Sequence, residues 1–319
     1  MKKVVQNIVK KINKSKRVCI TSHIRPDGDS IGSGLATYLM LKQFNKDVFF
    51  YNADKAPYPL TELPHYDVIE FKQIYEEDFD LVILIEGAGE KRNGQKKLDR
   101  FYTINIDHHS TSERNANINW VVPEVSAVGE LIFELGKALG IEFTKDICFN
   151  LFAAISSDTG SFKYSNTSDS SLFIASELVR MGNFKPYEVS DLLFNSNPYE
   201  KIEMISKVLS TLEMKLNNQV SIITFKREFL KNMDLKEIET EDIITIARSI
   251  IGVKVTLFFK EIDNDYYRVS IRSKGEINSQ EIAKKFNGGG HNHAAGFFYK
   301  GNLEESKDII LKEIEKQFK

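Results

Sequence analysis

Cysteine, net charge and long apolar runs are all scarce in this sequence, and each shortage excludes a class of protein. Only two cysteines, Cys19 and Cys148, occur among its 319 residues. Disulfide-stabilised scaffolds are short and dense in cysteine, so we expect two free, buried thiols instead. The formal net charge is only −2, which argues against a protein that coats long nucleic acids by bulk electrostatic attraction.

No apolar run approaches the roughly 20 residues that a membrane-spanning helix requires. The N-terminal segment 1–17 is basic and amphipathic but has no continuous apolar core, so it lacks the pattern of a signal peptide. We therefore expect a soluble, cytoplasmic protein that does not bind membranes.

The length suffices for two domains, and the first half of the chain has the pattern of an α/β fold. Apolar residues at helical spacing predict helices over 29–45, 126–139 and 146–156. Four short apolar runs have the lengths and flanks of buried parallel strands: 17–22, 47–52, 81–86 and 101–107. Strands alternating with helices predict a parallel sheet with helices on both faces.

The second half of the chain has a different pattern of apolar and polar residues. Segment 168–215 has a helical pattern, which the stretch FNSNPYEK at 194–201 interrupts at a plausible domain boundary. Alternating strands are then predicted at 218–225, 253–262 and 266–275, with helices at 240–250, 279–286 and 303–318. We expect a catalytic domain over 1–190, a helical linker over 191–215, and a smaller α/β domain over 216–319 across a cleft.

Polar clusters follow the predicted strands of the first domain, where functional residues of α/β sheets gather. The stretch TSHIRPDGDSIGSG places His23, Asp27 and Asp29 within seven residues. Carboxylates so close together repel, which raises the free energy of ionising both, and a bound cation would remove that penalty. The stretch is therefore either a metal site or an ordinary polar turn.

The tripeptide Asp107-His108-His109 follows another predicted strand. Adjacent side chains of an extended chain point to opposite sides, so the two imidazoles cannot face one ion in the same way. One is expected to bind metal and the other to face the substrate or support the ligands from behind. Asp158 ends a predicted helix, where it is either a further ligand or a helix-terminus cap.

Together, the ordered motifs SHIRPDGDSIGS, LVILIEGAGEKR, IDHH, SSDTGSF and GGGHNHAAG resemble those of DHH-family phosphoesterases with a DHH-associated C-terminal domain. The resemblance covers nearly the whole chain. It is greatest to the branch that contains oligoribonucleases for very short RNA, pAp phosphatases, and phosphodiesterases for cyclic di-AMP or linear pApA. It implies a catalytic domain that holds two Mn²⁺ ions, with Mg²⁺ or Co²⁺ as substitutes.

The resemblance also implies a ligand set. His23 and Asp27 should bind one ion and Asp29 the other, and His108 and Asp158 should complete the set. Glu86 stands where the family usually has an aspartate that bridges both ions. A glutamate is longer by one methylene, so it either bridges with a changed spacing, binds one ion, or weakens the site.

Three further residues of the first domain are implied to act near the reacting phosphate. Arg92 matches the family's arginine after the third predicted strand, and Asp107 and His109 belong to the IDHH motif. His109 is expected to contact the phosphate or assist proton transfer. Independently, carboxylates with a few imidazoles suit Mn²⁺. Two such ions roughly 3.5–4 Å apart can clamp a phosphoryl group and activate a water for in-line attack, without a protein nucleophile.

The C-terminal motif GGGHNHAAG is either a flexible turn or an anion site. Successive backbone N–H groups of Gly288, Gly289 and Gly290 can cradle an anion. His291, together with Arg272 and Ser273 of SIRSKG, adds donors. In the family this domain grips the nucleotide that is not cleaved. His293 stands where an asparagine is usual, which leaves that contact open.

We therefore expect a Mn²⁺-dependent phosphodiesterase that hydrolyses dinucleotides, such as pApA and also cyclic di-AMP, or very short oligoribonucleotides to mononucleotides. The alternatives are a 3′-phosphoadenosine 5′-phosphate phosphatase and a non-catalytic nucleotide sensor whose metal site Glu86 has weakened. The partner is expected to be a small nucleotide rather than a long nucleic acid, because basic tracts with interleaved aromatics are lacking. A homodimer remains open.

Overall fold

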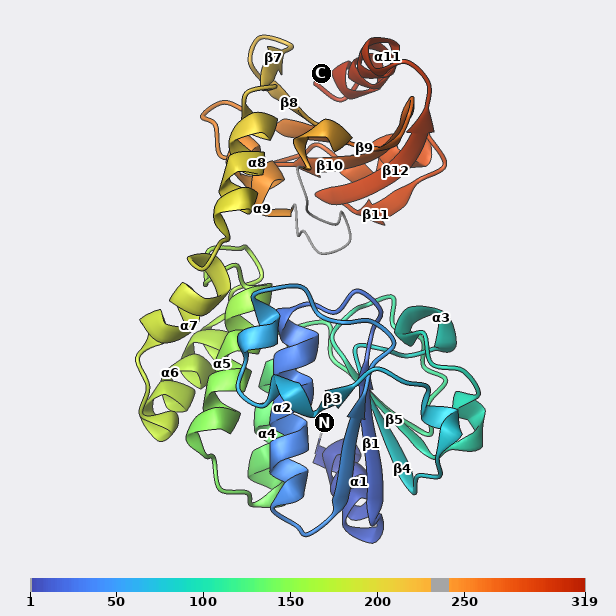
Figure 1. The fold of residues 1–319 in the computed structure, drawn as a ribbon, viewed down its shortest axis with the longest axis vertical. Coiled ribbons are helices and arrows are strands. Elements are labelled where there is room, and N and C mark those ends of the chain that lie inside the picture. Colours follow the sequence, from blue (N-terminus) through green and yellow to red (C-terminus); the bar gives the residue numbers. More distant parts are fainter. Residues whose placement is uncertain (1, 231–240, 319) are drawn as a thin grey trace. The chain divides into compact units, whose positions relative to one another are not determined.

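The computed structural model describes residues 2–230 and 241–318. The chain divides into two units, Met1–Ser196 and Asn197–Lys319 (Figure 1). Each has its own sheet and its own apolar core. The division falls inside the stretch FNSNPYEK, and the helix α8 (Tyr199–Leu209) belongs to the second unit.

The first unit is built on a parallel sheet of six strands in the order β3-β2-β1-β4-β5-β6. The predicted α/β class and all four predicted strands are confirmed; β3 and β6 were not foreseen. The strands are β1 (Arg17–Ser22), β2 (Asp47–Tyr51), β3 (Ile69–Glu70), β4 (Leu81–Ile85), β5 (Thr103–Asp107) and β6 (Ile118–Val121).

The two faces of this sheet are covered differently. Apolar side chains of α1, α2, α4 and α5 form one core with alternate residues of β1, β4 and β5. On the other face, Cys19, Val82 and Leu84 pack against Ile74 and Phe79 of short connecting segments. The helices are α1 (Lys2–Lys14), α2 (Gly28–Lys42), α3 (Glu90–Asn93), α4 (Val128–Leu139), α5 (Lys145–Asp158), α6 (Asp169–Gly182) and α7 (Pro186–Phe194).

The close packing of α2 on α5 depends on Gly32. A Cβ atom at this position would lie 2.5 Å from the carbonyl oxygen of Asn150 and 3.1 Å from the backbone nitrogen of Ala154. Any side chain would therefore push the two helix backbones apart. The contact holds the first turn of α2, with Asp29, near the last turn of α5, with Asp158.

The second unit contains a mixed sheet in the order β11-β12-β10-β9-β8-β7, in which only β8 and β9 pair in parallel. The predicted strands at 218–225, 253–262 and 266–275 are confirmed. The strands are β7 (Glu213–Lys215), β8 (Val220–Phe225), β9 (Val255–Asp263), β10 (Tyr266–Ser273), β11 (Gly289–His291) and β12 (Ala294–Lys300). The helical pattern predicted up to residue 215 was wrong at its end, because α8 stops at Leu209 and β7 then pairs with β8.

Helices cover the sheet of the second unit from both sides. Side chains of α10 (Ser279–Lys284) and α11 (Leu303–Glu315) pack with residues such as Val269 and Phe297. On the opposite face, α8 and α9 (Glu241–Arg248) pack over Ile223 of β8 and Phe258 of β9. The sheet is therefore enclosed on one face and covered along its β8–β9 part on the other.

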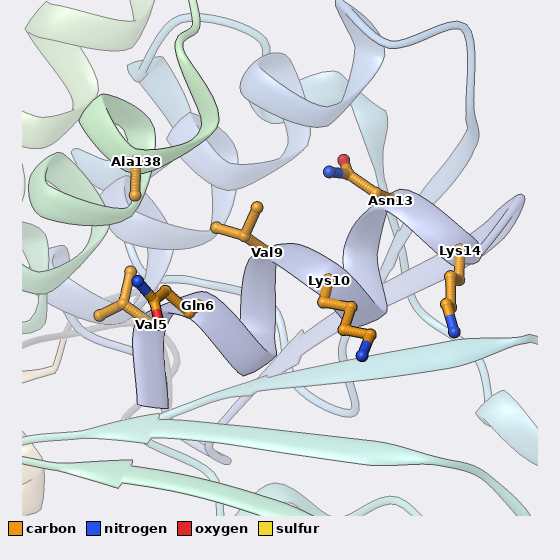
Figure 2. A pocket seen from close by; sticks show the side chains of 7 residues that line it. All are labelled: Val5, Gln6, Val9, Lys10, Asn13, Lys14 and Ala138. Atoms are coloured by element: carbon orange, nitrogen blue, oxygen red, sulfur yellow. The ribbon is translucent and has the colours of Figure 1, made fainter. Parts of the chain in front are cut away.

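Three further observations bear on the sequence predictions. Both cysteines are free and buried, as expected. Within residues 2–230 and 241–318, no helix combines the length and apolar character that crossing a bilayer needs. A shallow groove of about 400 Å³ runs along α1 beside α4, where Val5 and Val9 lie near Ala138 and Lys10 lies at the rim (Figure 2). None of the predicted site residues lines it.

Candidate active site

The site predicted from the sequence lies beyond the carboxyl ends of β1, β4 and β5. The chain leaves β1 toward β2 on one side of the sheet and later returns to β4 on the other side. Such a reversal of strand order opens a crevice at the strand ends, where polar side chains can meet without crossing a helix. His23 follows β1, Glu86 follows β4, and Asp107 ends β5.

His23, Asp27 and Glu86 form one group of potential metal ligands. The Nε2 atom of His23 lies 3.5 Å from Oδ2 of Asp27 and 3.7 Å from Oε2 of Glu86. Its Nδ1 atom lies 2.9 Å from the carbonyl oxygen of Ile24, which orients the ring with Nε2 toward the carboxylates. Asp27 also caps α2, because its Oδ1 accepts the backbone N–H of Ser30.

Asp29, His108 and Asp158 form a second group. The Nε2 atom of His108 lies 3.2 Å from Oδ2 of Asp158, and its Nδ1 lies 3.3 Å from the carbonyl oxygen of Val125. Burial lowers the pKa of His108, but the hydrogen bond to Asp158 and the charges of Asp29 and Asp158 raise it to about 9. Burial, with the charges of Asp29 and Asp27, raises the pKa of Asp158 to about 6 against the opposing effect of His108.

Asp29 is fully buried, and hydrogen bonds fix its carboxylate. Its Oδ2 accepts the backbone N–H of Val128 at 2.6 Å. Its Oδ1 accepts the backbone N–H of Gly129 at 3.0 Å and the hydroxyl of Ser33 at 2.9 Å. These N–H groups belong to the first turn of α4, where the helix dipole also favours a negative charge. The side chain is therefore held in place before any ligand binds.

Asp107 positions His109 rather than pointing into open space. Its Oδ1 lies 2.9 Å from Nδ1 of His109 and accepts the His109 backbone N–H at 2.9 Å. Burial raises the pKa of Asp107, but the hydrogen bonds from His109 outweigh it and lower the pKa to about 2. Arg92 donates to the backbone carbonyl of Glu86 at 2.6 Å and holds its guanidinium 3.3 Å from Nε2 of His109.

The two histidines of the motif have different surroundings, as the extended geometry predicts. His108 lies with Asp29 and Asp158, whereas His109 lies against Asp107 and Arg92. His109 also keeps its Nδ1 4.0 Å from Oε2 of Glu86. Its side chain is 28% exposed, about twice the 13% of His108, so His109 is the more accessible of the two to a substrate.

Glu86 lies between the groups. Its backbone is left-handed, with φ at +54°, directly after the last residue of β4. This conformation costs a non-glycine residue roughly 1–2 kcal/mol, so the surrounding structure must impose it. The carboxylate is 1% exposed, and burial followed by the charges of Asp29 and Asp27 holds its pKa well above the usual range. The backbone turn thus directs the Glu86 carboxylate toward His23 and Asp27.

Several polar atoms of this cluster are buried without a hydrogen-bond partner. They are Nε2 of His23, Oε1 of Glu86 and Oδ2 of Asp107. Leaving such groups unpaired normally costs stability, and a bound cation would satisfy the ligand atoms and offset the repulsion between carboxylates. The mixture of carboxylates and imidazoles suits a divalent ion such as Mn²⁺ and is unlike a cysteine-rich zinc site. The residues present therefore fit a divalent metal site.

A hydrogen-bond network that supports the group Asp29–His108–Asp158 was not predicted from the sequence. Glu130, 2% exposed in the first turn of α4, accepts the backbone N–H of Ser126 at 2.7 Å. The Ser126 hydroxyl donates to the carbonyl oxygen of Asn166 at 2.6 Å, and Asn166 Nδ2 donates to the carbonyl oxygen of Asp158 at 3.1 Å. The glutamate in the first turn of the predicted helix was the available signal, because such residues commonly cap helices.

In the second unit, the predicted substrate-binding residues differ in burial and in the hydrogen bonds that they already make. Arg272 is half-buried on β10 and donates to the carbonyl oxygen of Ile271 at 3.2 Å. Ser273 is 2% exposed, donates to the carbonyl oxygen of Ile277 at 2.7 Å, and lies 3.2 Å from Nδ1 of His293. Ser273 and His293 therefore stabilise the unit internally as they stand here.

The glycine motif is neither a free turn nor a simple loop. Gly289–His291 form the strand β11, which pairs with Ala294–Gly296 of β12. Because N–H groups of a strand alternate in direction, the three glycines do not present all their N–H groups to one point. Gly288 lies so close to β12 that a Cβ atom would be 2.3 Å from the carbonyl oxygen of Gly296. Anion binding by this motif stays a prediction.

Comparison with known proteins identifies the family of this chain. A family model described as the DHH family, N-terminal domain, matches residues 17–155, and a DHHA1 domain model matches residues 217–319. The chain is 30% identical over 303 residues to the bifunctional oligoribonuclease and PAP phosphatase NrnA of Thermus thermophilus, covering 94% of this chain and 90% of the relative.

Two further similarities extend over most of the chain. The protein of the same name from Bacillus subtilis is 29% identical over 299 residues, with 91% of each chain covered. A solved structure of an exopolyphosphatase-related protein from Bacteroides fragilis superposes with a TM-score of 0.88 at 25% identity, covering 99% of this chain and 96% of the other.

Proposed function

The chain belongs to the DHH family and is a phosphoester hydrolase, and on this basis we propose that it is a phosphodiesterase for dinucleotides and very short oligoribonucleotides that uses two Mn²⁺ ions. One observation carries the proposal: two groups of potential ligands, His23–Asp27–Glu86 and Asp29–His108–Asp158, lie beyond the carboxyl ends of neighbouring strands, and each contains one buried carboxylate.

The two groups would hold one divalent ion each, with Glu86 placed next to both. When bound, such ions polarise a phosphoryl oxygen and lower the pKa of a coordinated water. The buried, hydrogen-bonded setting of Asp29 keeps its carboxylate from rearranging when charge develops on the phosphate. Mg²⁺ or Co²⁺ are expected to support activity less well than Mn²⁺.

His109 and Arg92 would act on the phosphate itself. Asp107 accepts from the Nδ1 side of His109 and leaves Nε2 available to hold or release a proton. Arg92 lies 3.3 Å from that nitrogen and brings a permanent positive charge to the same place. The pair is therefore placed to bind a non-bridging phosphate oxygen and to assist the departure of the leaving group.

The names of the relatives support the substrate class. The Thermus thermophilus and Bacillus subtilis proteins are named as enzymes for oligoribonucleotides and for PAP. We infer that this chain hydrolyses pApA and short RNA, and that 3′-phosphoadenosine 5′-phosphate is a second substrate of the same site. Cyclic di-AMP is a further candidate, because it contains the same phosphodiester linkage.

A substrate panel tests the proposal. Purified full-length chain is incubated with pApA, PAP, cyclic di-AMP and RNA of two to ten nucleotides, with Mn²⁺ or with EDTA. We expect Mn²⁺-dependent release of mononucleotides, fastest from the shortest RNA. Asp29→Asn should lower kcat by about a thousandfold or more, whereas Asp78→Asn, whose side chain is 97% exposed, should not. Tight nucleotide binding without turnover would instead indicate a sensor.

A further inference from the structure

The carboxylate of Glu86 is not held in place by hydrogen bonds from its neighbours. Its Oε1 is buried without a hydrogen-bond partner. Its Oε2 lies 3.7 Å from Nε2 of His23 and 4.0 Å from Nδ1 of His109, and both distances exceed those of a hydrogen bond. In the absence of a cation, the charges of Asp29 and Asp27 also repel it. Other groups must therefore fix the direction of this side chain.

The direction of the Glu86 side chain differs from the one that β4 would give it. Side chains alternate along a strand, so an extended residue 86 would lie on the face of Leu84. Helices α2 and α5, which carry Asp29 and Asp158, cover the opposite face, on which Ile85 lies. With φ at +54°, residue 86 leaves this alternation, and its carboxylate joins the ligand groups. The left-handed turn is therefore what aims the carboxylate.

The short helix α3 binds both carbonyl oxygens of this turn. Arg92 Nε donates to the carbonyl oxygen of Glu86 at 2.6 Å, and Asn93 Nδ2 donates to that of Gly87, also at 2.6 Å. The backbone carbonyl of Arg92 in turn accepts the N–H of Ile24 at 2.8 Å. Because Ile24 lies in the loop after β1, α3 joins that loop to the turn after β4. These two segments supply the first group of ligands.

Asn93 acts on the protein alone. It is fully buried, so a substrate cannot touch its amide, in contrast to the partly exposed Arg92. Its Oδ1 accepts the backbone N–H of Gln95 at 2.8 Å, so both ends of the amide are engaged. The contact with Gly87 is close, because a Cβ atom on that glycine would lie 3.2 Å from Cβ of Asn93 and 3.3 Å from the backbone of Ser22. The turn is thus pressed directly against Asn93.

We propose that Asn93 is a positioning residue of the metal site, whose amide holds the turn at Gly87 and thereby aims the Glu86 carboxylate at the group His23–Asp27–Glu86. Without this donor the buried carbonyl oxygen of Gly87 would be unpaired. A rotation of the turn would then relieve both that oxygen and the left-handed backbone of Glu86, and would carry the carboxylate away from the ion. The inference rests on the proposed function, because it assigns Asn93 to the ligand placed next to both ions.

Binding of Mn²⁺ without substrate tests this role separately from turnover. The full-length chain is titrated with Mn²⁺, and the free ion is measured by its EPR signal. Asn93→Leu removes the donor from a side chain of similar shape and should raise the apparent Kd for Mn²⁺ about tenfold. Asn93→Ala should do the same, and the leucine variant decides the question if the alanine variant does not fold.

Asn150→Leu is the matched control. Asn150 is also fully buried, and its Nδ2 also donates to a backbone carbonyl, that of Pro64 at 3.1 Å. Both leucine variants should lower Tm in EDTA by several degrees, because each leaves a buried carbonyl unpaired. Only Asn93→Leu should weaken Mn²⁺ binding. Equal weakening in Asn150→Leu would overturn the proposal, because Mn²⁺ affinity would then simply follow the stability of the fold.

A double-mutant cycle with Glu86→Ala identifies the residue through which Asn93 acts. Once Glu86→Ala has removed the carboxylate, adding Asn93→Leu should not raise the Kd for Mn²⁺ any further. Losses that multiply in the double variant would overturn the proposal, as would wild-type affinity in Asn93→Leu alone.

Failure of the proposed function would look different from failure of this inference. A wild-type chain that binds no Mn²⁺, or a Glu86→Ala variant that binds it as tightly as the wild type, would overturn both. Tight binding by the wild type, weak binding by Glu86→Ala and unchanged binding by Asn93→Leu would overturn the role of Asn93 alone.

Discussion

The two units display their functional side chains in opposite ways. In Met1–Ser196 the candidate ligands are largely buried, and residues such as Asp29 have every oxygen engaged by a donor. In Asn197–Lys319 several candidate recognition residues are more accessible: Arg272 is half-buried, and His291 and His293 are exposed. Chemistry at one phosphate needs fixed charges in a water-poor site, whereas recognition of ligands that differ in length and base needs a surface that tolerates variation.

The largest effect should come from the buried site, at Glu86. Glu86→Ala removes the carboxylate between the two ligand groups and should abolish activity, lowering kcat by about a thousandfold or more. Glu86→Asp keeps the charge on a shorter arm and should retain part of the activity or exceed the wild type. Steady-state kinetics with pApA and Mn²⁺ check both. Equal rates for Glu86→Ala and wild type would remove Glu86 from the site.

Disturbing the support behind the ligands should cost less. Glu130→Gln weakens the hydrogen bond that fixes the Ser126 backbone. The neighbouring backbone positions the Val125 carbonyl oxygen beside His108 and the Val128 N–H beside Asp29, so both contacts should loosen. Supporting residues of metal sites typically contribute about 10–100-fold to metal affinity or activity. We expect a weaker apparent affinity for Mn²⁺ and a kcat restored in part at high Mn²⁺. Glu134→Gln, on the exposed side of the same helix, is the matched control. A kcat loss that no Mn²⁺ concentration relieves would contradict a supporting role.

Removing Arg272 should separate recognition from chemistry. An arginine–phosphate contact is charge-assisted and contributes about 1.5–3 kcal/mol, or one to two decades in affinity. Arg272→Ala should therefore raise KM for pApA by about tenfold or more and leave the hydrolysis of bis-p-nitrophenyl phosphate nearly unchanged, because that compound has no second nucleotide. Equal losses on both compounds would place Arg272 in folding or at the reacting phosphate.

The smallest effect should appear in the stability of the metal-free chain. The pKa of Asp158 is raised to about 6 and that of His108 to about 9, so both bind protons more tightly when folded than when unfolded. Stability should therefore fall as pH rises, between about pH 4 and 6 for Asp158 and between about 6.5 and 9 for His108. In EDTA we expect Tm to drop by several degrees from pH 5 to pH 8.5.

Added metal should reverse that trend, because deprotonated ligands bind a cation best. Mn²⁺ should raise Tm more at pH 8.5 than at pH 5, as measured by differential scanning fluorimetry. Asp158→Asn should flatten the lower part of the metal-free profile. A larger Mn²⁺ effect at pH 5 than at pH 8.5 would mean that the ion binds elsewhere.

Sequence patterns predicted the elements whose environment is uniform along their length. β1, β4 and β5 are buried on both faces, so they are continuous apolar runs. β3 has two residues and β11 consists mostly of glycine, and neither has the composition from which a strand is predicted. The same reasoning explains why the end of α8 was predicted too late. The short, half-exposed strand β7 has no alternating or continuous apolar pattern that separates it from the helix before it.

The candidate site was predictable where side chains alone define it. His23, Asp27, Asp29 and the histidines after Asp107 could be named because carboxylates and imidazoles follow predicted strand ends. Glu86 and Asp158 were assigned as ligands through the family resemblance. The backbone N–H groups of Val128 and Gly129 could not, since every residue carries such a group and only the fold aims these two at Asp29.

The contact of α2 with α5 through Gly32 has a consequence for the order in which the chain is made. It joins Asp29, near the start of the sequence, to Asp158, near the end of the first unit. A ribosome that has released only the first strands has therefore produced His23, Asp27 and Asp29 without the partners that complete the ligand groups. The growing chain therefore cannot complete the group Asp29–His108–Asp158 until α5 has emerged and docked on α2.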